Sequence, residues 1–241
     1  MTIAARGAAT VALMILVTGC AGPSIESSTQ LDILETRPAN GVVHGADLFP
    51  LDAAPRTFEI VGVDTDPPAV VAVSAEATDR FEATMAVRMG DRTEYRRRDA
   101  DGTIRSPAVI DHRQRALTRF DPPLTLAPAT LTPGTPVTEE VAMRVLDARN
   151  PKRVRESGHA TRTIEYVDDQ RLRTPWGDLD AKRVVVTFEA RLRLARADTR
   201  TTLWVTPGRG VVAREDEERL RVLGLPTEPK IRRLVLAEDR P

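Results

Sequence analysis

A strict alternation of apolar and polar residues constrains the fold of this chain more than any other feature. It is clearest in RVVVTFEARLRLA, residues 183–195. Successive side chains of a β-strand point to opposite faces, so this segment would have one apolar face and one charged face. A helix would scatter the same leucines and arginines around its surface. The residues predicted to share the apolar face are Val184, Val186, Phe188, Ala190, Leu192 and Leu194.

The same period of two recurs along most of the chain. Residues 81–89, FEATMAVRM, form a second predicted strand, and residues 160–167, ATRTIEYV, place Arg162 on one face with Ile164 and Tyr166. Segments rich in Gly, Pro and Asp, such as DADG and TPGRG, separate the strands and are typical of turns. We therefore expect a mainly β fold, either a curved antiparallel sheet, an open β-barrel or a two-sheet sandwich, with few short helices. The sequence EDEERLRVLG, residues 215–224, fits a helix or a further strand.

Changes in composition divide the 241 residues into three predicted parts. Residues 1–19 are an export signal, because a single positive charge precedes a short apolar run. Residues 20–45 begin with small and polar residues and are predicted to be a flexible tether. Residues 46–241 are predicted to form one mostly antiparallel β domain, with possible sub-halves at 46–125 and 126–241.

The only cysteine of the chain, Cys20, directly follows the apolar run. The sequence Val-Thr-Gly-Cys that ends at this residue resembles the lipobox of bacterial lipoproteins. That resemblance implies that the Cys20 thiol carries a diacylglyceryl group and that the signal is cut between Gly19 and Cys20. The alternative is an unmodified cysteine in a secretory signal that is cut elsewhere.

Acylation at Cys20 would place the protein on a membrane of the bacterial envelope. Two or three acyl chains hold a protein stably on a bilayer, whereas one is marginal. Ala21 follows the cysteine where the usual sorting rule has Asp for the inner membrane, so the outer membrane, facing the periplasm, is favoured. The expected partners are this membrane, through the acyl chains on Cys20, and an unknown envelope protein or lipid.

Several functional classes lack the residues that they need. Lys and Arg number 35, as do Asp and Glu, so there is no basic surplus for binding nucleic acid. The histidines, His44, His112 and His159, have no metal-ligand spacing, and serine-hydrolase, P-loop and dinucleotide-binding motifs are absent. We therefore expect no metal, no cofactor and no catalytic residues, and we interpret the protein as a non-enzyme.

Turn-rich motifs spread over most of residues 49–213 are similar to those of a loose group of bacterial envelope proteins and lipoproteins without an assigned function. They are FPL with a following Phe in residues 49–58, PPL to PG in residues 122–134, and TPWG with LWVTPGRG in residues 174–210. This group is similar in architecture to the Lol lipoprotein carriers and related open, curved sheets. The resemblance implies a concave apolar face and no catalytic residues.

Two functions fit these observations. The first is a non-catalytic binding or scaffold role at the envelope, and the alternative is a carrier or binder of a lipid-like apolar ligand in the concave sheet. Residues 93–99, TEYRRRD, could dock an acidic partner or form a solvated strand end. The candidate apolar lining could equally be an ordinary filled core. Its members are Phe81, Met85, Met89, Val184, Val186, Phe188 and Leu192.

Overall fold

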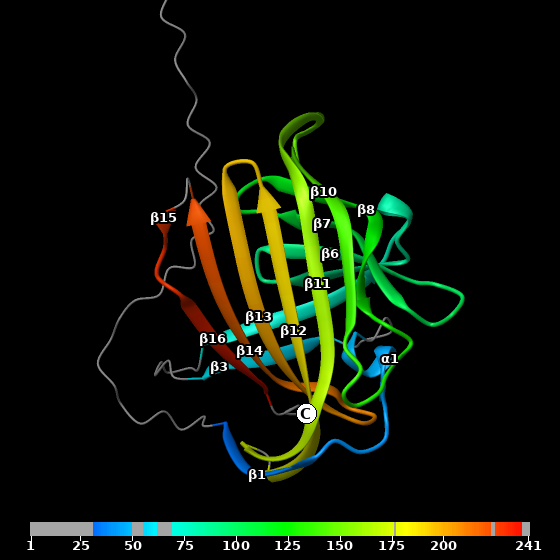
Figure 1. Ribbon diagram of the computed structural model, residues 1–241, viewed down its shortest axis with the longest axis vertical. Helices are drawn as coiled ribbons and strands as arrows, with labels where there is room; N and C mark the ends of the chain where they lie inside the picture. The colour runs from blue at the N-terminus through cyan, green and yellow to red at the C-terminus, as the bar shows by residue number, and fades with distance from the viewer. Residues whose placement is uncertain (1–30, 50–54, 62–68, 176, 223–224, 238–241) are drawn as a thin grey trace, which may run out of the picture.

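The computed structural model of the protein describes residues 31–49, 55–61, 69–175, 177–222 and 225–237 (Figure 1). The predicted signal, Cys20 and the start of the tether lie outside these residues. The strands are β1 (Asp32–Pro38), β2 (Val43–His44), β3 (Arg56–Val61), β4 (Val70–Ala77), β5 (Met85–Met89), β6 (Arg92–Arg98), β7 (Ile104–Asp111), β8 (Ala116–Ala127), β9 (Thr130–Leu131), β10 (Val137–Asp147), β11 (Asn150–Thr174), β12 (Gly177–Leu192), β13 (Ala195–Thr206), β14 (Gly210–Val222), β15 (Leu225–Pro226) and β16 (Lys230–Leu236). The helical elements are α1 (Gly45–Leu48) and the 3-10 turn η1 (Arg80–Glu82).

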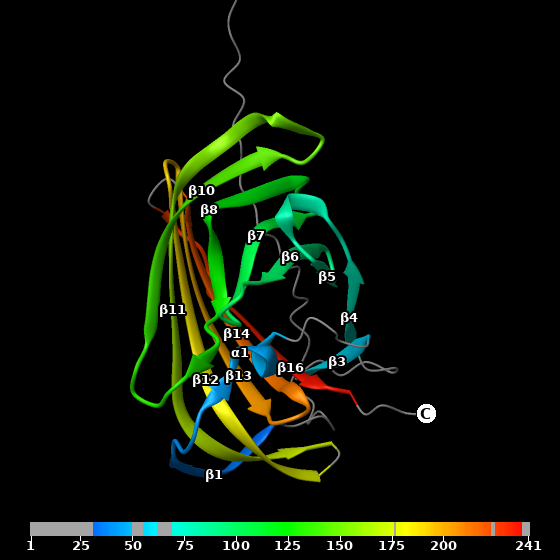
Figure 2. The same ribbon diagram turned by 90° about the vertical axis from the view of Figure 1, so that its right-hand side faces the viewer.

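Twelve antiparallel strands form a closed barrel, which confirms the predicted mainly β fold. Hydrogen-bonded neighbours run in the order β11-β10-β8-β7-β6-β5-β4-β3-β16-β14-β13-β12, and β12 then pairs with β11 to close the ring. The two views show these strands wrapping around one interior (Figures 1 and 2). Strands from both predicted sub-halves are therefore joined in a single sheet, with β8 beside β10 and β3 beside β16.

Alternation along the strands decides which side chains enter the barrel. On β11, Ile164 and Tyr166 are 1% and 0% exposed and face inward, as their apolar face predicted. They pair in register with Val186 and Val184 of β12. These four residues belong to a core at the end of the barrel that includes α1, which packs against β8, β13 and β14. A second buried cluster lines the inner wall, with members Ala116, Phe120, Leu124, Val141, Met143, Val145, Ala160 and Ala190.

Residues 32–44, which the sequence places in the tether, are instead bound to the barrel. Strand β1 pairs with the far end of β11 from Asp32↔Arg173 to Pro38↔Asp168. Beyond β1, the buried Tyr166 hydroxyl donates to the Asp169 carboxylate at 2.5 Å and accepts from the Asn40 backbone N–H at 3.1 Å. The tether is therefore shorter than predicted, because β11 extends past the barrel ring and offers β1 an edge.

Two segments differ from their simplest sequence interpretation. The chain at Phe81 forms η1 instead of continuing a strand, with φ at +56° for Phe81, and β5 begins only at Met85. Phe81 consequently packs edge-on against Tyr95, with ring centroids 4.7 Å apart, in a separate cluster. Residues 215–222 form the end of strand β14 and not a helix. Among the described residues, no helix has the length and apolar character needed to cross a bilayer.

Candidate functional site

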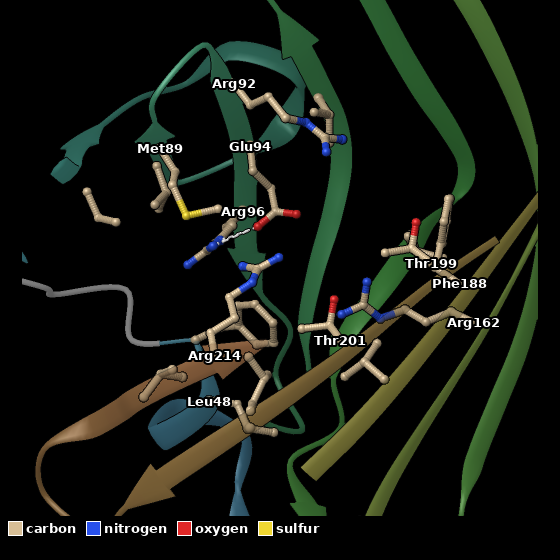
Figure 3. Close-up of a pocket in the computed structure, with 18 of the residues that line it drawn as sticks. Leu48, Met89, Arg92, Glu94, Arg96, Arg162, Phe188, Thr199, Thr201 and Arg214 are labelled. Atoms are coloured by element: carbon tan, nitrogen blue, oxygen red, sulfur yellow. Dashed lines mark hydrogen bonds and ion pairs between the residues drawn. The ribbon is translucent and has the colours of Figure 1, made fainter. Parts of the chain in front are cut away.

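The barrel encloses a cavity of about 310 Å³, which lies in the size range of small-molecule binding sites (Figure 3). Its walls come from α1 and from strands around the ring, and most of the lining is apolar. The apolar lining residues are Leu48, Phe49, Phe58, Val73, Val87, Met89, Val109, Phe120, Leu124, Val186, Phe188, Ala197, Leu203, Val211 and Leu234. The cavity therefore lies between the filled core at the α1 end and the cluster on the inner wall.

Charged side chains also enter this interior, and positive charge dominates. The charged lining residues are Arg56, Arg92, Glu94, Arg96, Arg162, Arg214 and Glu218, which is five arginines and two glutamates. They occupy positions of their strands from which the side chain points inward, because successive side chains of a strand point to opposite faces. Burying guanidinium groups is costly unless each is paired or hydrogen-bonded, so their partners decide what the site can bind.

On β6, Glu94 and Arg96 neutralise each other. The Arg96 Nε donates to the Glu94 carboxylate at 2.7 Å, and the side chains of Arg96 and Glu94 are only 13% and 25% exposed. Burial would raise the pKa of Glu94, but Arg96 and Arg162 outweigh it and hold the pKa below its usual value. The Arg96 guanidinium also stacks 4.9 Å from the centroid of the Phe49 ring. Glu94 is therefore an ionised carboxylate that is already committed to an arginine.

On β14, Arg214 has a similar carboxylate partner. Its Nε donates to Asp216 at 2.8 Å, and the same carboxylate accepts from the Thr201 hydroxyl at 2.7 Å. Arg232 of β16 lies 3.5 Å from Asp216 as well. Burial would raise the pKa of Asp216, but Arg214 and Thr201 hold it below its usual value. Two arginines thus share one negative charge.

Arg162 of β11 has no carboxylate partner among the described residues. Its Nη2 donates to the Leu126 backbone carbonyl at 3.3 Å, and its buried Nε makes no hydrogen bond. The pKa of Arg162 is lowered to about 10, chiefly by burial and also by Arg214 and Arg96, while Glu94 and Glu139 oppose this shift. Arg162 is therefore charged at neutral pH and poorly solvated. Figure 3 shows its guanidinium pointing into the cavity toward Arg214 and Glu94.

We expect the Glu218→Gln variant to stabilise the fold at neutral pH. Burial raises the pKa of Glu218, although Arg92 and Lys230 lower it, so the folded protein holds the proton more tightly than the unfolded chain. Above that raised pKa, the ionised Glu218 carboxylate destabilises the folded state. The gain from glutamine should shrink as the pH falls through the raised pKa, and it should be lost below 4.5, the ordinary value, because the carboxyl is then protonated in both states.

Urea unfolding of the two proteins between about pH 4 and pH 8 measures this difference. Glu217→Gln, on the opposite face of the same strand, is the matched control and should not stabilise the fold, because the Glu217 carboxylate pairs with Arg219 at 2.7 Å. A stability gain that is the same at every pH would contradict the assignment.

Three of the seven residues of the predicted apolar lining reach the cavity. Met89, Val186 and Phe188 line the cavity. Val184 lies in the filled core, and Leu192 packs against the inner-wall cluster. Phe81 lies in the cluster of Tyr95 and is not among the cavity residues, and neither is the half-buried Met85.

None of the arginines of the interior is among the residues predicted to line a binding site. One signal was available, because the alternation of residues 160–167 puts Arg162 on the face of the buried Ile164 and Tyr166. Of the charged residues in segment 93–99, only Glu94 and Arg96 line the cavity. An arginine that shares a face with core residues on a strand is a useful indication of an interior charge.

The interior fits binding better than metal chemistry. Within the described ranges, no group of three or more histidine, cysteine or carboxylate side chains is placed to hold a metal ion. The site combines apolar walls, the Thr199 and Thr201 hydroxyls and an excess of guanidinium groups. Such a surface can enclose an apolar body and can donate hydrogen bonds to a polar group.

Comparisons of the chain with protein-family models, with curated proteins and with solved structures found no match. The resemblance to envelope lipoproteins therefore stays a prediction, and no activity or partner is carried over from a relative.

Proposed function

We propose that this protein is a lipid-anchored protein of the bacterial envelope that binds one acyl-chain-like ligand inside its barrel. The observation that carries the proposal is the cavity of about 310 Å³ with its predominantly apolar lining. The anchor on Cys20 and the periplasmic face of the outer membrane are part of the proposal, on the basis of the lipobox-like sequence.

The number of strands supports an interior that accepts a ligand. Barrel diameter grows with strand number; about eight strands enclose an interior that side chains can just fill, and about sixteen leave a channel. Twelve strands lie between these cases. In this barrel the core around α1 fills one end, and space remains beside Met89 and Phe188.

The apolar wall indicates the kind of ligand. Burying apolar surface contributes about 25 cal/mol per Å², so a chain of methylene groups gains affinity along such a wall without needing specific hydrogen bonds. A scaffold role, the other function that the sequence fits, requires only outer surfaces. The cavity therefore favours the ligand-binding function.

The test is photocrosslinking of the full chain in isolated membranes. A long-chain fatty acid with a diazirine in its chain is added without ATP, so that it is not attached enzymatically, and crosslinked peptides are mapped by mass spectrometry. We expect adducts in the peptides that carry cavity residues such as Met89 and Phe188.

The variant Ala197→Trp should reduce these adducts to the level of an unirradiated sample. Ala197 lines the cavity, and an indole there would occupy the space of the ligand. Arg200→Trp, at an exposed position of the same strand, is the control and should label like the unmodified protein. Adducts confined to outer-surface peptides would contradict the proposal.

A further inference from the structure

We infer that the ligand carries a compact anionic head group, a carboxylate or a phosphate monoester, and that Arg96, Arg162 and Arg214 hold this group inside the barrel. The inference rests on the proposed function, since it names the ligand class of the same cavity. The apolar wall explains only why the ligand has an acyl chain. The inference adds a charged group at one end of that chain.

The three arginines come from separate strands and converge on one region. Arg96 is on β6, Arg162 on β11 and Arg214 on β14, and Figure 3 shows their side chains directed into the same part of the cavity. Phe49 lies beside them, with its ring centroid 4.9 Å from Arg96 and 6.0 Å from Arg162. Three of the five arginines that line the cavity are thus gathered in one region of it.

The carboxylates nearby do not balance this charge. Glu94 is bound by Arg96, and Asp216 is shared between Arg214 and Arg232. Each of these two carboxylates is therefore already paired with an arginine other than Arg162. Burial disfavours the charged form of Arg162, and Arg214 and Arg96 add repulsion, whereas Glu94 and Glu139 favour it. An anion placed among the three groups would relieve this repulsion.

Arg162 also has unused donors. A guanidinium has five N–H donors, and the described contacts of Arg162 account for one of them, to the Leu126 carbonyl. Its Nε is buried without a partner. A planar guanidinium can bind a carboxylate or a phosphate through two parallel hydrogen bonds, and such charge-assisted bonds are the strong ones. A neutral head group would leave the excess charge of the cluster in place.

The walls next to Arg162 place the chain relative to the head group. Arg162 pairs in register with Phe188 of β12, and both line the cavity. The Arg162 guanidinium and the apolar wall are therefore adjacent. A ligand with an anion at one terminus can satisfy both at once.

Three photoprobes with the same diazirine-bearing chain test the inference. One ends in a carboxylate, one in a phosphate monoester and one in a primary alcohol. They are compared at equal concentrations in isolated membranes, and the yield of cavity adducts is measured. The two anionic probes identify which head group is preferred. We expect at least one anionic probe to label about tenfold more than the alcohol, the effect of hydrogen bonds to a charged group.

Three variants connect this preference to Arg162. In Arg162→Gln the preference for the anion should fall to about one while the alcohol still labels the cavity, and Arg162→Lys should keep part of it. Arg144→Gln, at an exposed position on the adjacent strand β10, is the control and should keep all of it.

Different labelling results would contradict the two proposals. Equal cavity labelling by all three probes in the unmodified protein would overturn the head-group inference and leave the proposed function intact. A preference that survives in Arg162→Gln would also overturn the role of Arg162. Labelling of the cavity by none of the probes would overturn both proposals.

Discussion

Replacing Cys20 with serine is expected to abolish the incorporation of a fatty-acid label into the protein and to release it from the lipid anchor. The physical reason is that a thioether, formed at a thiolate, is the linkage that holds the diacylglyceryl group, and serine cannot form it. Because Cys20 is the only cysteine of the chain, no other thiol can replace it. Growth with an alkyne fatty acid, followed by in-gel detection of the full chain, measures the change.

A double variant separates the position of the thiol from its presence. In Cys20→Ser with Ser24→Cys the chain keeps one cysteine, moved four residues along. The lipobox-like sequence then no longer ends in cysteine, so labelling should stay at the background level. Labelling of Cys20→Ser equal to that of the unmodified chain would falsify the lipoprotein proposal.

The second large effect is expected for Gly158→Ala in the seam that closes the barrel. Gly158 of β11 pairs with Leu192 of β12, and a Cβ built on this glycine would lie 1.9 Å from the Arg191 carbonyl oxygen. It would also lie 2.9 Å from the carbonyl carbon, so backbone rather than a flexible side chain would have to move. Overpacking of this kind costs about 3 kcal/mol of unfolding free energy.

Thermal unfolding of the full chain followed by circular dichroism measures this loss. For a domain of this size, a loss of about 3 kcal/mol lowers the Tm by about 6–12 °C. Gly90→Ala is the comparison, because Gly90 has a φ of +59° but no atom within 4 Å of a built Cβ. Its backbone strain alone costs about 1 kcal/mol. Equal shifts for both variants would show that the close approach at the seam is not the cause.

The fold class could be predicted because period two is a local property of the chain. The alternation that begins at residue 183 corresponds to β12 as far as its end at Leu192. Leu194, predicted on the same apolar face, lies in the bend after this strand and is 41% exposed. The same pattern placed Ile164 and Tyr166 on an inward face. It failed at Phe81, where residues that alternate correctly form a 3-10 turn, and Phe81 packs against Tyr95 instead of lining the cavity.

The candidate site was predicted only in part. Met89, Val186 and Phe188 reached the cavity, while Val184 was used to fill the core next to it. Alternation separates inward from outward faces, but it does not say at which height of a barrel the interior is filled. That depends on what crosses the end of the barrel, which here includes α1.

The sequence by itself determined most of the strands and the faces of their side chains, because both depend on neighbouring residues. It also carries the lipobox-like pattern at Cys20 on which the proposed anchor rests. Tertiary structure decided the closure of the ring, since the pairing of β3 with β16 joins strands from opposite ends of the β domain. An open sheet or a sandwich would leave these two strands apart, whereas β11 and β12 form a local hairpin. Tertiary structure also decided that Arg96, Arg162 and Arg214 meet in one cavity. These residues lie on three separate strands and come together only when the ring is closed. A local sequence pattern cannot show that residues so far apart in the chain are close in space.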